Sequence, residues 1–222
     1  MTIFENSKIK LEKFTSGSLS NNSYLISSKK DGNSVVIDVP NKPMELINKI
    51  PRNRFDKSEN IDKIKILITH GHYDNIEGLD IFAERLGLLD LYIGYVDANY
   101  LNYLGNVTRL RNQAYIENAS IRLKLIYTPG HTEGSVCYFL DAVDQKFLFS
   151  GDTLFPGGPG KTIDSRNFSK ILESIKNKLY ILPKETIILP GHGEHITLED
   201  SINEFNHFQY KNNIFGDVSW IN

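Results

Sequence analysis

The residues with the clearest chemical meaning are two histidines and an aspartate that fall close together, His70, His72 and Asp74. They directly follow the apolar run 64–68, in a stretch whose glycine and polar residues favour a loop. Neutral imidazole and carboxylate are ligands that suit zinc, iron or manganese. A zinc ion that only stabilises a fold is more often bound by cysteines, and this chain has a single one, Cys137. The spacing therefore predicts a metal site with a chemical role.

Three further potential ligands come shortly after apolar runs that resemble strands: His131, Asp152 and His192. A single histidine is more often a hydrogen-bonded or solvated residue than a ligand, but here four of the six histidines share this position. In sheet proteins, sites gather on the loops at strand ends, which a rigid sheet holds in place. We therefore expect these strand ends to converge at one edge of a sheet and to bind metal there.

Alternating and apolar runs predict strands along most of the chain, and amphipathic spacing predicts helices between them. The expected strands are 9–14, 23–27, 34–39, 64–68, 91–95, 123–127, 135–140, 146–149 and 186–189. The expected helices are 43–50, 76–86 (ended by Gly87), 168–175 and 198–208. Residues 97–120 show no clean period. This mixture predicts an α/β fold, in a single domain that spans residues 1–222.

The charge and the composition limit the classes of partner. The 222 residues carry 25 basic and 27 acidic side chains, so the chain has no overall attraction for nucleic acid or anionic lipid. The amino terminus lacks the apolar core of a signal peptide, and no run approaches the ~18 apolar residues of a membrane helix. We expect a cytoplasmic protein with a small-molecule substrate and no nucleic-acid or membrane partner. Whether it forms a homo-oligomer is left open.

Four short motifs occur in order along the chain. They are His70-x-His72-x-Asp74, Pro129-Gly130-His131-Thr132, Gly151-Asp152-Thr153 and Pro190-Gly191-His192-Gly193. With these motifs the chain resembles the metallo-β-lactamase-fold hydrolases, and within them the glyoxalase II-like branch. The resemblance covers almost the whole chain, and the ordered set is far more specific than any one motif. It implies an αββα four-layer sandwich, with two mixed β-sheets face to face, helices on the outer faces, and metal ions at one rim.

The resemblance also implies which residues hold metal ions. The first ion would be bound by three histidines and a bridging aspartate, His70, His72, His131 and Asp152. The second would be bound by Asp74, His192 and the same Asp152. The family's remaining ligand is a histidine, whereas this chain has Asn75, whose amide oxygen is a poorer ligand. We expect one strong Zn²⁺ site, with iron or manganese as alternatives, and a weak or empty second site. A helix N-cap is the other role considered for Asn75.

Such a site implies a metal-dependent hydrolase in which a metal-bound hydroxide attacks the carbonyl of a small thioester, ester or lactone. Asp74 is the expected catalytic residue, because it would orient or deprotonate that water when no second metal engages it. Lys161 follows a glycine-rich loop that borders the substrate in the glyoxalase II-like enzymes, so it is a candidate contact for an anionic substrate group. Asn75 is a second candidate contact. The tyrosine-rich segment 95–115 is interpreted as a lid or as edge packing.

Two alternative functions stay open. Persulfide dioxygenases, which use a single iron, share the fold, and the weakened second site favours this alternative. The other alternative is a non-catalytic binding protein on a hydrolase fold, although decay would not be expected to spare so many ligands together. Iron with oxygen consumption would indicate the dioxygenase, and zinc with ester cleavage would indicate the hydrolase.

Overall fold

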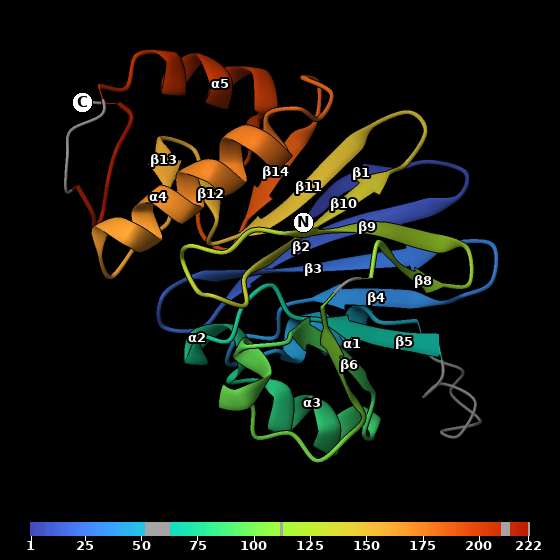
Figure 1. Ribbon diagram of the computed structural model, residues 1–222. Coiled ribbons are helices and arrows are strands. Elements are labelled where there is room, and N and C mark those ends of the chain that lie inside the picture. The colour runs from blue at the N-terminus through green and yellow to red at the C-terminus, as the bar shows by residue number, and fades with distance from the viewer. Residues whose placement is uncertain (52–62, 112, 210–213, 222) are drawn as a thin grey trace.

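The computed structural model describes residues 1–51, 63–111, 113–209 and 214–221. Within these ranges the chain forms two mixed β-sheets that pack face to face, with helices on both outer sides (Figure 1). This is the αββα sandwich that the resemblance to the metallo-β-lactamase-fold hydrolases implies. Among the described residues, the first sheet has seven strands in chain order: β1 (Thr2–Glu5), β2 (Ile9–Ser16), β3 (Asn21–Ser28), β4 (Ser34–Ile37), β5 (Ile64–Leu67), β6 (Asp90–Gly94) and β7 (Val107–Leu110).

The first sheet is antiparallel from β1 to β4 and parallel from β4 to β7. The second sheet, within the same described ranges, has six strands in the order β15, β14, β11, β10, β9, β8. Their bounds are β8 (Tyr115–Asn118), β9 (Ile121–Tyr127), β10 (Val136–Asp141), β11 (Lys146–Gly151), β14 (Ile187–Pro190) and β15 (Ile196–Thr197). Only β11 and β14 run parallel in it. A small ribbon, β12 (Leu154–Phe155) with β13 (Gly158–Pro159), lies beside it.

Helices cover both outer faces. On the side of the first sheet lie α1 (Met44–Lys49), α2 (Tyr73–Ile76), α3 (Leu79–Leu86) and a 3-10 helix, η2 (Asp97–Tyr100). On the side of the second sheet lie α4 (Ser165–Ser174), its π-helical continuation η3 (Ile175–Leu179), and α5 (Leu198–Asn206), drawn orange and red in Figure 1. No helix in the described ranges is long and apolar enough to cross a membrane.

The alternation of side chains along each strand divides the apolar core into three layers. In β4, Val35 and Ile37 join the cluster between the two sheets, whereas Val36 faces outward. The outward cluster packs against Phe82 of α3, and a third cluster joins the second sheet to Phe168 of α4. The two sheets are therefore buried on both faces, which makes them a rigid support for the loops at their edges.

One predicted helix differs from the structure for a long-range reason. The spacing predicts a continuous helix over 76–86, but the structure has α2 and α3, separated at Glu77 and Gly78. Gly78 N donates to Val39 O, and a Cβ on Gly78 would lie 2.2 Å from Pro40 O. The close approach of the chain after β4 therefore interrupts the helix. Gly87 ends α3 with φ of 91°, as predicted.

Six strands in the described ranges lie where none is predicted: β1, β7, β8 and the two-residue strands β12, β13 and β15. β1 pairs with β2 at one edge of the first sheet, while β7 and β8 are the last strands of the two sheets, within the segment 97–120 that shows no clean period. Edge strands of four residues carry little alternation, so their pairing depends on the neighbouring strand. The predicted strand 34–39 also ends earlier, at Ile37, because Asp38 adopts φ of 56° and turns the chain.

Candidate metal centre

Five of the six predicted ligands lie at the ends of four strands, whereas Asp74, which was expected in a loop, is the second residue of α2. His70 and His72 follow β5, and His131 lies between β9 and β10. Asp152 follows β11, and His192 follows β14. The first sheet supplies the first two residues and the second sheet supplies the other three. The structure therefore brings residues from distant parts of the chain to one rim of the sandwich.

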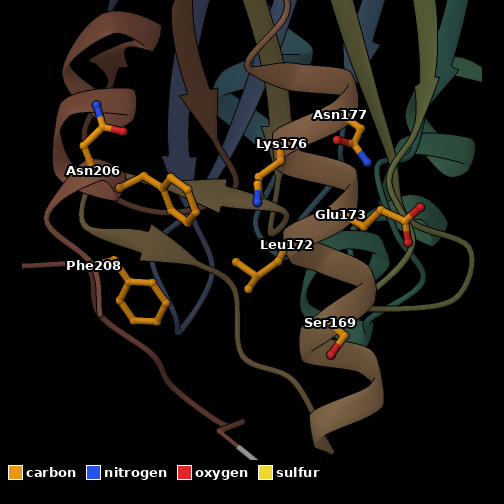
Figure 2. A pocket seen from close by; sticks show the side chains of 8 residues that line it. Ser169, Leu172, Glu173, Lys176, Asn177, Asn206 and Phe208 are labelled. Atoms are coloured by element: carbon orange, nitrogen blue, oxygen red, sulfur yellow. The ribbon is translucent and has the colours of Figure 1, made fainter. Parts of the chain in front are cut away.

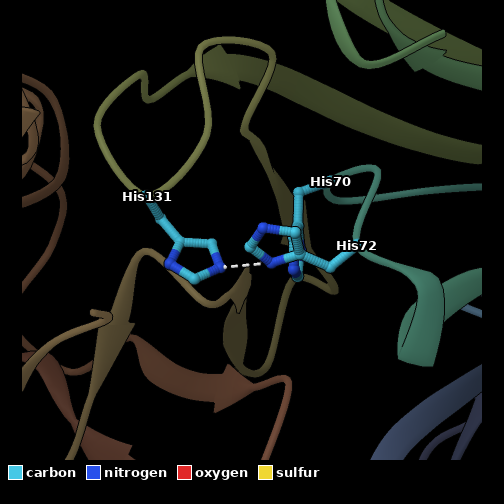
Figure 3. A group of neighbouring side chains, drawn as sticks. All are labelled: His70, His72 and His131. Atoms are coloured by element: carbon cyan, nitrogen blue, oxygen red, sulfur yellow. Dashed lines mark hydrogen bonds between the residues drawn. The ribbon is translucent and has the colours of Figure 1, made fainter. Parts of the chain in front are cut away.

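Three histidines form the centre of this group. The rings of His70, His72 and His131 lie 4.6 to 4.8 Å apart between centroids, and each pair is nearly perpendicular, at 80 to 87°. One nitrogen from each ring lies within 4.8 Å of the others (Figure 3). His131 Nε2 and His72 Nδ1 are 2.9 Å apart. Imidazoles that converge from three directions are positioned to hold a metal ion.

The protonation of these rings suits metal binding. Burial lowers the pKa of His70 well below its usual value, and the neighbouring histidines lower it further. Burial also lowers the pKa of His131 to about 4, against a weaker opposing effect from its hydrogen bond to Lys161. Both rings are therefore neutral at physiological pH and offer a lone pair. A neutral imidazole is the form that binds a metal ion, so the donor set fits one.

Hydrogen bonds set the orientation of two of the rings. His131 Nδ1 donates to Lys161 O at 2.8 Å, which leaves Nε2 facing the centre. His70 Nδ1 lies 3.1 Å from Thr69 Oγ1, and that hydroxyl donates to Asp38 Oδ2 at 2.8 Å. Outer partners of this kind fix the tautomer and the ring orientation of metal-binding histidines. Lys161 therefore contributes its carbonyl, and the contact of its ammonium with substrate stays a prediction.

Asp38 was not identified from the sequence. Its side chain is fully buried, and burial raises its pKa to about 7 while two hydrogen bonds from Thr69 oppose the shift. An acidic residue at the end of an apolar run, as Asp38 is after β4, is the same signal that identified Asp152. The expected strand 34–39 included Asp38, whereas the structure ends β4 at Ile37 and places Asp38 just after the strand.

Asp97 is a second residue that the sequence analysis missed. It is buried at the start of η2, and its carboxylate accepts hydrogen bonds from Gly71 N at 2.8 Å and from Gly134 N at 2.9 Å. Thr132 Oγ1 also donates to it, at 2.6 Å. One carboxylate thus joins the loop that carries His70 and His72 to the loop that carries His131. No sequence signal marks this role, because segment 97–120 has no period.

We expect Asp97→Ala to weaken metal binding roughly ten- to a hundredfold, because the two ligand loops lose their shared acceptor. The measurement is competition for zinc against a chromogenic chelator at pH 7.5. Asp80→Ala is the control, because Asp80 is exposed on α3. An unchanged zinc affinity in a folded Asp97→Ala variant would show that the loops hold their positions without this carboxylate.

Asp152 lies between the histidines of the two predicted metal positions. Its Oδ2 is 3.6 Å from His131 Nε2 and 3.7 Å from His192 Nε2. Burial raises its pKa to about 6. Its other oxygen, Oδ1, is buried and has no hydrogen-bond partner among the described residues. A buried acceptor without a partner is unusual, so this oxygen is available to bind a cation.

The residues predicted to hold the second metal ion are joined by hydrogen bonds. Asp74 Oδ2 accepts from Asn21 Nδ2 at 2.7 Å and lies 3.5 Å from His192 Nε2. The hydrogen bond with His192 holds the pKa of Asp74 well below its usual range, and Asp74 in turn raises the pKa of His192. Asn21, at the start of β3, was not identified from the sequence. Its amide donates to Asp74 where a cation would otherwise balance the charge.

These pKa directions predict that the two metal positions respond differently to pH. As pH falls through the raised pKa of His192, its ring takes a proton, pairs with Asp74 and offers no lone pair. His70 and His131 have lowered pKa values, so they stay neutral in the same range. In crystals soaked with excess zinc, we expect anomalous scattering at the three histidines at pH 6 and 8, and added density near His192 only at pH 8. Equal occupancy of both positions at pH 6 would contradict this.

Asn75 has a different role from the helix cap considered in the sequence analysis. It is the third residue of α2, and the N-cap position is occupied by His72, so the capping interpretation is wrong. Its side chain is fully buried, with Nδ2 3.0 Å from His70 Nε2, and Oδ1 has no partner among the described residues. The amide therefore packs against a predicted ligand of the first site. That it weakens the second site stays a prediction.

A cavity of about 540 Å³ opens beside the three histidines. It borders His72 and His131 and extends between α2, η2 and the start of α4. Its lining residues are Gly71, His72, Tyr73, Ile76, Val96, Asp97, Tyr100, His131, Thr132, Glu133, Ile163 and Asn167. The tyrosine-rich segment is thus divided: 96–100 forms part of the cavity wall, and the strands β7 and β8 are edge packing.

The sequence profile of the Metallo-beta-lactamase superfamily matches residues 17–192. The chain is 34% identical over 158 residues to a probable metallo-hydrolase, YqgX, of Bacillus subtilis, with 64% of this chain and 74% of that protein covered. It is 27% identical to a probable hydroxyacylglutathione hydrolase of Schizosaccharomyces pombe, with 79% of this chain and 65% of that protein covered. The crystal structure of the B3 metallo-beta-lactamase BLEG-1 superposes with a TM-score of 0.72 at 25% identity, over 87% of this chain and 96% of that one.

Proposed function

Because the chain belongs to the metallo-beta-lactamase superfamily, we propose that it is a hydrolase with one strongly bound divalent metal ion that cleaves a small thioester, ester or lactone. The observation that carries the proposal is the set of three converging imidazoles with Asp152 beside them. Similarity to a probable metallo-hydrolase supports the reaction class, and similarity to a probable hydroxyacylglutathione hydrolase supports the kind of bond.

His70, His72, His131 and Asp152 would hold the ion. Zinc is the first expectation, because it suits imidazole and carboxylate ligands, and iron or manganese are the alternatives. Neutral imidazoles with a single carboxylate leave a net positive charge at such a site. When bound, the ion supplies Lewis acidity, which polarises a carbonyl and lowers the pKa of water.

Asp74 would orient the attacking water. The low pKa of its carboxylate keeps it ionised at neutral pH, so it accepts a hydrogen bond from water instead of carrying a proton. Asn21 and His192 hold its Oδ2, which restricts the rotation of the side chain. Full transfer of a proton to so weak a base is unfavourable, so positioning is the larger contribution of Asp74.

The test is elemental analysis of the purified protein combined with a panel of small esters, thioesters and lactones. Zinc with cleavage of one of these bonds supports the proposal. Iron with oxygen consumption on a persulfide would overturn it in favour of the dioxygenase. A metal-loaded protein that turns over neither class of substrate would support the non-catalytic alternative.

A further inference from the structure

The cavity beside the histidines is bordered by large side chains that face solvent. Tyr73, the first residue of α2, is 72% exposed, and Tyr100, the last residue of η2, is 73% exposed. Ile163, which precedes α4, is 76% exposed. Exposed apolar groups scattered singly need no explanation, but these three come from separate elements and line one cavity.

The hydroxyl groups show that these tyrosines differ from others in the chain. Tyr103 and Tyr138 are held by hydrogen bonds from their hydroxyls to Leu89 O and Ile68 O. Within the described ranges, the hydroxyls of Tyr73 and Tyr100 have no such partner. Their rings are therefore not fixed by the fold and are available to contact a ligand.

The charges around the cavity are negative or already paired. Its described lining includes two carboxylates, Asp97 and Glu133, and neither a lysine nor an arginine. Asp97 is engaged with the two ligand loops, and Glu133 forms an ion pair with Lys170. Away from the predicted metal position, an anionic group in this cavity would meet carboxylates and no free lysine or arginine side chain of the described lining, at a cost in desolvation. An uncharged group would lose nothing and would bury apolar surface.

We propose that this cavity binds an uncharged apolar group, aromatic or branched aliphatic, attached to the carbonyl that is cleaved. The inference rests on the proposed function, and it narrows the substrate to a neutral acyl ester or thioester instead of one with an anionic acyl group. The volume of about 540 Å³ lies within the range of small-molecule sites, and the cavity reaches two predicted ligands directly, His72 and His131.

Another hollow of similar volume, about 560 Å³, does not compete for this role. It lies between α4 and α5 and is lined by residues such as Lys176 and Phe208 (Figure 2). None of its lining residues in the described chain is a predicted ligand. A group bound there would have no contact with the histidine centre.

The test compares acyl groups on one leaving group, 4-nitrophenol. We expect kcat/KM for the phenylacetyl ester to exceed that for the hemisuccinyl ester about tenfold or more. Tyr100→Ala should lower kcat/KM for the phenylacetyl ester about three- to tenfold more than it lowers kcat/KM for the acetyl ester, because the larger group reaches the ring. A wild-type protein that prefers the hemisuccinyl ester would overturn the proposal.

A charge substitution makes the test specific to the cavity. Ile163→Lys places a cation in it, so the ratio of phenylacetyl to hemisuccinyl kcat/KM should fall at least fivefold. Ile181→Lys is the matched control, because Ile181 is equally exposed, at 74%, but does not line the cavity. The same ratio in Ile163→Lys and in wild type would overturn the proposal.

A binding measurement separates this inference from the proposed function. If none of the esters is cleaved, the proposed function fails, and the cavity is tested with phenylacetamide and succinamate by ligand-observed NMR. Binding of phenylacetamide that weakens in Tyr100→Ala, together with no binding of succinamate, would support the uncharged apolar site. Absence of phenylacetamide binding, or binding that is the same in Tyr100→Ala, would overturn it.

Discussion

Replacing His131 with alanine is expected to remove the metal ion and to lower kcat/KM about a thousandfold or more. A bound metal contributes several kcal/mol to the stabilisation of the transition state, and each ~1.4 kcal/mol is a factor of ten in rate. His131 is one of three converging imidazoles, and its Nε2 also lies 3.6 Å from Asp152 Oδ2. Its loss therefore removes one of the three nitrogen ligands and the neighbour of Asp152. Metal content by plasma mass spectrometry and kcat/KM on the best ester of the panel are the measurements.

The fold of His131→Ala is expected to survive. His131 lies on a rim loop, and the three apolar clusters formed by described residues do not include it. Circular dichroism and thermal unfolding of the metal-free proteins check this. His207→Ala is the matched control, because His207 is exposed at the end of α5. If purified His131→Ala kept both its metal and its turnover, the assignment of this ligand would be wrong.

Replacing Asn75 with histidine is expected to raise the metal content from near one toward two ions per chain. The substitution supplies a nitrogen donor at the position where this chain departs from the ligand pattern of the family, directly after Asp74, whose Oδ2 lies 3.5 Å from His192 Nε2. The opposing cost comes from packing, because Asn75 is fully buried and contacts His70. Inserting a larger side chain at such a position costs about 1–3 kcal/mol. Plasma mass spectrometry gives the stoichiometry.

Asn75→Ala is the matched control for this experiment, because it removes the amide and adds no ligand, so the metal content should stay near one. A folded Asn75→His variant that still binds one ion would contradict the prediction and would point to another obstacle. The first candidate for that obstacle is Asn21, whose amide donates to Asp74 Oδ2 at 2.7 Å. The double variant Asn75→His/Asn21→Ala would then gain the second ion.

The sequence by itself determined the ligand types and their order. His70, His72 and His131 were identified from spacing and from their place after apolar runs, and the structure brings their rings together. The same local signals predicted the central strands, because a half-buried strand alternates apolar and polar residues and a fully buried one reads as a short apolar run. The end of α3 at Gly87 was also predicted from the sequence, since glycine adopts positive φ at low cost.

Only the tertiary structure decided which residues support those ligands. Asp38 reaches Thr69 across 31 residues, Asp97 reaches Gly71 across 26, and Asn21 reaches Asp74 across 53. The interruption between α2 and α3 likewise comes from the approach of the chain at Pro40. Periodicity and turn propensity report interactions within a few residues along the chain. Hydrogen bonds between loops depend on how the two sheets stack. This stacking is set by the packing of the whole core.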